Sequence, residues 1–154
     1  MSKLALSFYS ACVCLAILTL GAFGQVVTTE PAKPKWGDTL KITYNPQSPG
    51  ASFTLDQEVR VTVYQAIAGT DEPKSQTVTM ARSGNVLNCE VKIEADVGDI
   101  QLIFFHPPEK YDSKARQMLM VYRSDGQPAR GAWLTQGMSR NYQEAVANEL
   151  ALYP

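Results

Sequence analysis

The sequence has 154 residues, of which 45% are hydrophobic, and its formal net charge is −1. This charge balance excludes the strongly basic surface that binding to nucleic acid requires. The length suits one domain with one core, which needs neither a metal nor a disulfide in order to fold. Of the 3 cysteines, two lie at positions 12 and 14, so the rest of the chain holds a single thiol and no intramolecular disulfide.

Residues 1–24 are predicted to be a cleavable signal peptide. Lys3 precedes an apolar run over residues 4–20, and small residues follow up to Gly24. We therefore expect cleavage between Gly24 and Gln25 and export to the periplasm or the extracellular space. The alternative is an uncleaved membrane anchor, because the apolar run approaches the roughly 20 residues that cross a bilayer. We expect contact with a membrane only in that case.

Residues 25–37 contain prolines, polar residues and a glycine, and they are predicted to form an extended lead-in. Residues 38–135 then carry short runs of alternating apolar and polar residues, separated by turn-forming residues. We predict strands at Leu40–Tyr44, Val59–Tyr64, Thr77–Met80, Leu87–Ile93, Ile100–Phe105, Met118–Tyr122 and Ala129–Leu134.

The third and fourth of these strands are predicted to pair as a hairpin, because the turn formers Ser83-Gly84-Asn85 lie between them. About seven short strands, spaced by 8–12 residues with no helix between them, are typical of an antiparallel immunoglobulin-like β-sandwich. We therefore predict a mainly β fold of this class.

The tail, residues 139–153, is predicted to be an α-helix. Asn141 and Glu144 have the spacing of a capping box. The residues that recur at helical intervals are Tyr142, Val146, Glu149/Leu150 and Tyr153. The apolar stripe must be buried against another element. Either the helix packs on the edge of the sandwich, or it connects to a domain that follows Pro154.

Three segments resemble a known family. They are Pro34–Asn45 (PKWGDTLKITYN), Ser124–Ala132 (SDGQPARGA) and Glu149–Pro154 (ELALYP). They resemble the N-terminal region of bacterial exported thioredoxin-like proteins of the thiol-disulfide oxidoreductase type. In those proteins an immunoglobulin-like domain comes first, a helical connector follows, and a thioredoxin domain carries the redox cysteines. The resemblance implies an accessory module, because this chain has no Cys-x-x-Cys pair.

Residues that could carry chemistry are sparse. Cys89 alternates with Leu87 and Val91, which favours a buried and inert thiol over a reactive one. His106 is the single histidine, and a metal site that combined it with Glu109 or Asp112 would still need one or two further ligands. We therefore expect no catalytic residue, no cofactor-binding residue, no metal site and no enzymatic activity in this chain.

A recognition surface is the remaining possibility. Tyr64 faces away from Val61 and Val63, and residues 107–115 form the longest polar connection between two strong strands. The residues that we predict to contribute to recognition are Tyr64, His106, Glu109, Tyr111 and Asp112.

The leading hypothesis is a non-catalytic exported accessory module whose partner is a thioredoxin-like domain or another envelope protein. The second hypothesis is a self-contained secreted domain that binds carbohydrate or protein. An enzyme in its own right is the third, and it lacks any set of nucleophile, base and orienting group in the sequence. The oligomeric state is left open.

Overall fold

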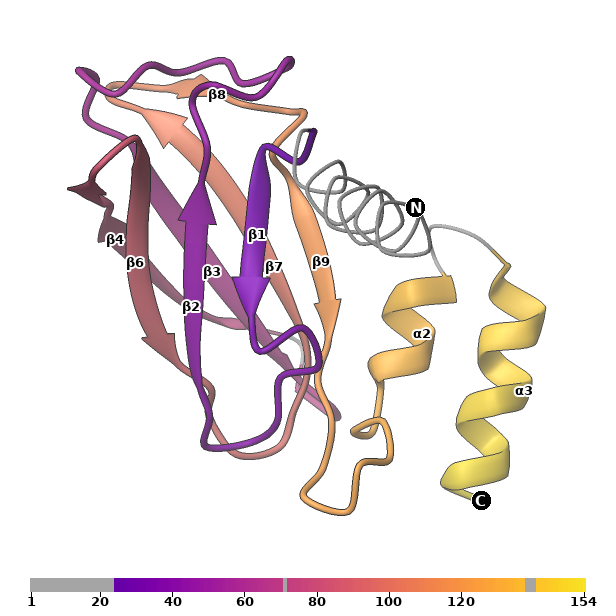
Figure 1. Cartoon of the computed structure of the whole chain (residues 1–154). Coiled ribbons are helices and arrows are strands. Elements are labelled where there is room, and N and C mark those ends of the chain that lie inside the picture. The colour runs from indigo at the N-terminus through magenta and orange to yellow at the C-terminus, as the bar shows by residue number, and fades with distance from the viewer. Residues whose placement is uncertain (1–23, 71, 138–140) are drawn as a thin grey trace, which may run out of the picture.

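The computed structural model describes residues 24–70, 72–137 and 141–154, which form two packed β-sheets followed by two helices (Figure 1). The four-stranded sheet has, in spatial order, β1 (Val27–Glu30), β2 (Thr39–Tyr44), β6 (Val86–Lys92) and β5 (Ala81–Ser83). The five-stranded sheet has β4 (Lys74–Thr79), β3 (Arg60–Ile67), β7 (Val97–His106) and β8 (Lys110–Tyr111), with β9 (Gln117–Met120) also paired to β7. The helices are α2 (Ala132–Gly137) and α3 (Tyr142–Leu152).

All paired strands run antiparallel. The first, second, sixth and fifth strands share one sheet, and the third and seventh form the centre of the other. This is the strand order of an immunoglobulin-like sandwich with one additional strand beside the third. The predicted fold class is confirmed, with nine strands rather than about seven. One additional strand, β1, lies within the predicted extended lead-in and pairs with β2.

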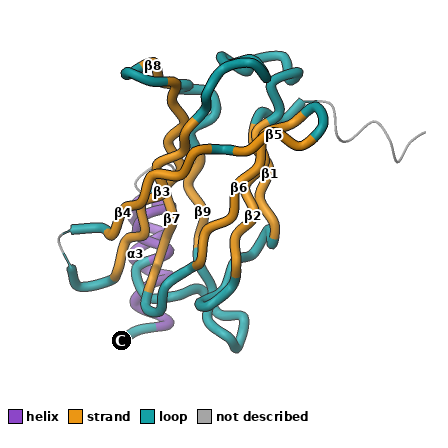
Figure 2. Tube along the Cα trace, turned by 90° about the vertical axis from the view of Figure 1, so that its left-hand side faces the viewer, coloured by secondary structure: helices purple, strands orange, loops and turns teal. Residues whose placement is uncertain are grey.

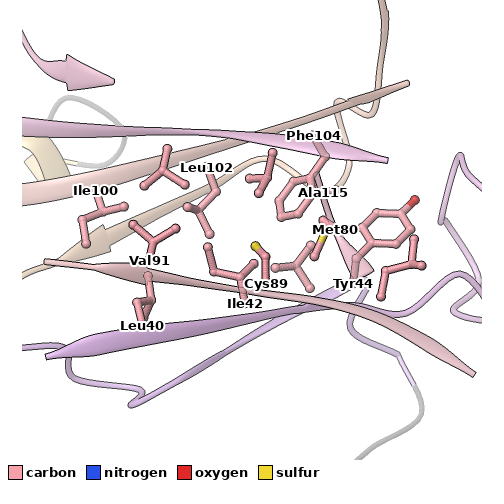
Figure 3. Packing of buried hydrophobic residues seen from close by; sticks show 14 of the residues in the cluster. Leu40, Ile42, Tyr44, Met80, Cys89, Val91, Ile100, Leu102, Phe104 and Ala115 are labelled. Carbon is pink, nitrogen blue, oxygen red and sulfur yellow. The ribbon is translucent and has the colours of Figure 1, made fainter. Parts of the chain in front are cut away.

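The core fills the space between the two sheets, because alternate residues of each strand point inward. Figure 3 shows these side chains from β2, β6 and β7 pointing toward one another. The labelled members from these strands are Leu40, Ile42, Tyr44, Cys89, Val91, Ile100, Leu102 and Phe104. Cys89 is buried among them as predicted, and burial together with the nearby Glu90 raises the pKa of its thiol to about 11.

The predicted hairpin between residues 77–80 and 87–93 is wrong. β4 pairs with β3, so that Val78 lies opposite Val61 in the five-stranded sheet. The chain changes sheets at Met80, whose backbone N–H donates to the Val59 carbonyl at 2.9 Å. The next strand, β5, then pairs with β6. Alternation of apolar residues fixes which face a strand buries, but it does not fix the neighbouring strand.

The strand predicted at Ala129–Leu134 is also wrong, because the chain turns into α2 at Ala132. Before that, Pro128 bridges back to Tyr122 and the Ala129 N–H donates to the Val121 carbonyl at 2.8 Å. Gly131 then adopts a φ of 84°, a backbone conformation that residues with a side chain rarely take. This turn redirects the chain from an extended path into a helix.

The helix predicted in the tail is confirmed as α3. The Asn141 side-chain oxygen accepts from the Glu144 N–H at 3.3 Å, which is the predicted cap, although residues 139 and 140 lie outside the described residues. The buried face matches the predicted stripe at Glu149 but not at Leu150. Ala145 and Glu149 are buried, whereas Leu150 is 61% exposed.

The C-terminal helix is tied to the base of the sandwich by two side chains. The Glu149 carboxylate, 8% exposed, accepts from the Gly131 N–H at 2.6 Å. The Tyr153 hydroxyl donates to the Pro128 carbonyl at 2.8 Å.

The predicted signal peptide falls almost entirely on residues 1–23, which lie outside the described residues. In the part of the chain that is described, no helix has the length and apolar character needed to cross a bilayer.

Candidate recognition surface

Tyr64 lies in the middle of β3 with its side chain on the outer face of the five-stranded sheet, as predicted from the inward positions of Val61 and Val63. It stands opposite Ser75 on β4 and Gln101 on β7. Residues directly opposite each other in an antiparallel pair lie on the same face. The outer face can therefore be followed from strand to strand through the register.

Apolar side chains also lie on this outer face, although the two residues directly opposite Tyr64 are polar. Phe105 on β7 stands opposite Tyr111 on β8, and their ring centroids are 5.9 Å apart. Gln101 stands opposite Met118 on β9. We call the set Tyr64, Ile103, Phe105, Tyr111 and Met118 the aromatic face.

Exposure differs along the aromatic face. Tyr111 is 60% exposed, and the other members are half-buried. From Gln101 to Phe105 the strand advances by roughly 13 Å at about 3.3 Å per residue. Tyr64 and Tyr111 therefore mark two ends of one surface, which is long enough to contact an extended ligand over several of its units.

A positive charge lies beside this surface. When the Gln101 amide oxygen faces Arg116, it accepts hydrogen bonds from the guanidinium, including one from Nε at 3.0 Å. The Gln101 amide therefore fixes the direction of an exposed guanidinium next to the rungs that carry Tyr64 and Met118. An oriented guanidinium favours carboxylate groups or backbone carbonyls in a ligand.

His106 and Glu109 do not join the aromatic rings. The Nδ1 atom of His106 is 2.7 Å from the Glu58 carbonyl oxygen, and its ring packs at 6.4 Å from Phe53. This histidine holds the end of β7 against the loop before β3. Glu109 is exposed in the turn between β7 and β8.

Asp112 does not lie on the predicted recognition surface, because it is only 2% exposed. Its Oδ2 accepts from the Tyr44 hydroxyl at 2.7 Å and from the Ser52 N–H at 3.0 Å. Its Oδ1 accepts from the N–H groups of Lys114 and Ala115 at 3.1 and 3.3 Å. Asp112 therefore anchors the loop after β8 to the core, and this anchor holds the neighbouring Tyr111 in place.

The hydrogen bonds at Asp112 predict a loss of stability in acid. Burial raises the pKa of Asp112, but the hydrogen bonds from Tyr44, Ser52 and Lys114 outweigh it and hold the pKa below its ordinary value. A carboxylate with a lowered pKa in the folded state stabilises that state above its unfolded pKa, near 3.9, and this contribution is lost as the pH falls through the folded pKa. The free energy of unfolding should therefore decline below about pH 4.

Urea unfolding of the protein and of the Asp112→Asn variant, measured between pH 6 and pH 2, tests this expectation. The variant has no carboxylate to protonate at this position, so its stability should change less over the acid range. Equal acid slopes for the two proteins would show that Asp112 does not cause the loss.

The base of the sandwich holds a pocket of about 430 Å³, lined by Trp36, Ala68, Asp96, Arg123, Arg130 and Tyr153. The Trp36 indole N–H donates to the Val97 carbonyl at 2.8 Å, which fixes this wall. Arg123 forms an ion pair with Asp125, and Asp96 also lines the pocket, so the two guanidinium charges are largely offset. The pocket is therefore a weaker candidate for ligand binding than the aromatic face.

No group of three or more His, Cys, Asp or Glu residues that could hold a metal ion occurs within residues 24–70, 72–137 and 141–154. Comparisons with models of protein families, with curated proteins and with solved structures gave no match. The resemblance to exported thioredoxin-like proteins is therefore carried by the sequence segments alone.

Proposed function

We propose that this chain is a non-catalytic, exported immunoglobulin-like module that recognises a protein partner through the aromatic face. The observation that carries the proposal is that the register places Tyr64 and the contacting rings of Phe105 and Tyr111 on the outer face of the five-stranded sheet. Tyrosine and phenylalanine supply large contact area at a low cost in conformational entropy, and they are enriched at protein interfaces.

The residues whose side chains could most readily take part in a reaction have structural roles instead. This supports recognition over catalysis. The Cys89 thiol lies in the core and its pKa is raised, so little nucleophilic thiolate forms at neutral pH. The imidazole of His106 contacts a backbone carbonyl. The carboxylate of Asp112 accepts four hydrogen bonds within the fold.

The partner that we propose is a thioredoxin-like domain or another envelope protein. The attachment of α3 supports this, because Glu149 and Tyr153 tie the last helix to the base of the sandwich. A helix held in this way would give a domain that follows it a defined starting position. If the purified protein reduced insulin disulfides without a partner, the proposal of a non-catalytic module would be wrong.

The same attachment also favours the second candidate, a self-contained secreted domain that binds protein or carbohydrate. A docked helix needs no further domain to cover its buried face, which includes Ala145 and Glu149. The intact mass of the protein isolated from its own cell envelope separates the two candidates. A mass that fits residues 25–154 supports the self-contained domain, whereas a much larger mass supports an accessory module joined to a further domain.

A further inference from the structure

β4 is the most exposed edge strand of the two sheets. It lies at the edge of the five-stranded sheet (Figure 2), where it pairs with β3 through six residues. Nearly all of its side chains are exposed. The other edge strands of the described chain are shorter. β1 has 4 residues and is followed by Pro31, and β9 has 4 residues and contacts α2. β5 has 3 residues and β8 has 2. Proteins usually prevent edge strands from pairing with another chain by keeping them short or by placing prolines or charged residues in them. In β4 the single charged residue is Lys74, at its beginning.

The register shows which backbone groups of β4 face outward. The Met80 N–H donates to the carbonyl of Val59, which is the residue directly opposite it when the β3–β4 register is extended by one rung. Hydrogen-bonded and non-hydrogen-bonded pairs alternate along an antiparallel ladder. Val78 and Gln76 are therefore in hydrogen-bonded pairs with β3, and the intervening residues direct their N–H and C=O groups away from it. These residues are Ser75, Thr77 and Thr79.

Side-chain geometry agrees with this assignment. The hydroxyl oxygens of Thr77 and Thr62 are 2.9 Å apart across the two strands. Side chains approach most closely in non-hydrogen-bonded pairs, which is the type assigned to this rung. Within the described residues, β4 is paired with β3 and with no other strand.

We propose that two copies of this chain associate by pairing their β4 strands antiparallel, about a twofold axis that passes beside Thr77. Thr77 of one copy then lies opposite Thr77 of the other, and Ser75 of each lies opposite Thr79 of the other. All three rungs use the outward-facing backbone groups. Because each such rung exchanges two hydrogen bonds, the pairing forms about six.

The β4 sequence is compatible with itself in this register, which is why we commit to a second copy as the partner. Lys74 of each copy lies opposite Met80 of the other, and Gln76 lies opposite Val78, so no two like charges meet. Lys74 is already paired with Glu94 at 3.1 Å within its own copy. A twofold interface brings the same surface together from both copies, as this one does.

The pairing has a consequence for recognition. A twofold axis perpendicular to the joined sheet keeps both outer faces on the same side, so the two aromatic faces become parts of one continuous surface. The inference does not depend on the proposed function, since β4 can pair whether or not the aromatic face binds a partner. A strand pair of this length buries less than the roughly 1,200 Å² typical of a stable complex, so we expect a reversible dimer.

Sedimentation velocity of the purified protein, expressed as the full chain so that any processing occurs in the cell, tests the pairing. We expect a monomer–dimer equilibrium over a series of concentrations up to about 1 mM. Thr77→Pro removes an N–H that points away from β3, so no β3–β4 hydrogen bond is lost. Proline is tolerated at such outward-facing positions of edge strands. It should weaken dimerisation by about tenfold or more. The matched control Thr77→Val retains the N–H and should dimerise like the parent protein.

A strictly monomeric protein over this range, or a dimer unaffected by Thr77→Pro, would overturn the proposal. Amide hydrogen exchange of the unmodified protein provides a second measurement that does not rely on the variant folding. The N–H groups of Ser75, Thr77 and Thr79 should become better protected as protein concentration rises. Protection that does not depend on concentration would also overturn it.

Discussion

Replacing Asp112 by alanine is expected to cost about 3 kcal/mol of folding free energy, since it removes a buried carboxylate that four donors share. The Tyr44 hydroxyl and the Ser52 N–H both donate to Asp112 Oδ2. Tyr44 is fully buried, so water cannot replace the carboxylate without opening the core. The loop that carries Tyr111 should loosen as well, because the Lys114 N–H loses its acceptor and the Ala115 N–H keeps only the backbone carbonyl of residue 112.

Urea unfolding at pH 7 measures this cost. Asp125→Ala is the matched control, because Asp125 is also a carboxylate in a turn, but its side chain is 45% exposed. The control should change stability much less than Asp112→Ala, because water can replace the carboxylate at an exposed position. A loss below about 1 kcal/mol for Asp112→Ala would show that the buried network contributes little to stability.

Replacing Gly98 by alanine is expected to destabilise the protein by about 2–4 kcal/mol and to detach the C-terminal helices from the sheet. A Cβ atom at Gly98 would lie 2.5 Å from the Arg130 carbonyl oxygen and 3.3 Å from the Ala132 nitrogen. Both contacts are with backbone, so the segment that leads into α2 must move as a unit. That movement would also disturb the hydrogen bond between Gly131 and Glu149.

Urea unfolding and limited proteolysis together measure the Gly98→Ala effect, with faster cleavage expected in residues 129–154. Gly126→Ala is an informative control, because a Cβ there meets nothing within 4 Å but the residue has a φ of 84°. Its cost should be only the roughly 1 kcal/mol of the backbone conformation. If Gly98→Ala cost no more than this control and left cleavage unchanged, the close approach at Gly98 would not matter for docking.

Most of the β-sandwich could be predicted because alternation of apolar residues identifies the buried face of a strand. Val61 and Val63, for example, indicate correctly that Tyr64 points outward. Neighbouring strands could not be predicted in the same way. β4 and β5 are joined at Met80, and nothing in the local pattern indicates that the chain passes from one sheet to the other there.

The candidate site was predictable only in part. The sequence indicates Tyr64 and Tyr111 but not Phe105, because residues 100–105 are apolar apart from Gln101, a pattern that is typical of a strand covered on both faces. Asp112 looked like a solvated loop residue, since its neighbours in sequence are polar. Its decisive partners, Ser52 and Tyr44, are 60 and 68 residues away in sequence, and only the fold brings them together.

Site-specific photo-crosslinking in the native cell envelope tests the central claim most directly. A photoreactive phenylalanine analogue would replace Tyr111 on the aromatic face and, as a matched control, Lys41 on the exposed outer side of the four-stranded sheet. We expect a discrete adduct with a protein of one identity from position 111 and little or none from position 41. Equal crosslinking from both positions, or none from position 111, would contradict recognition through the aromatic face.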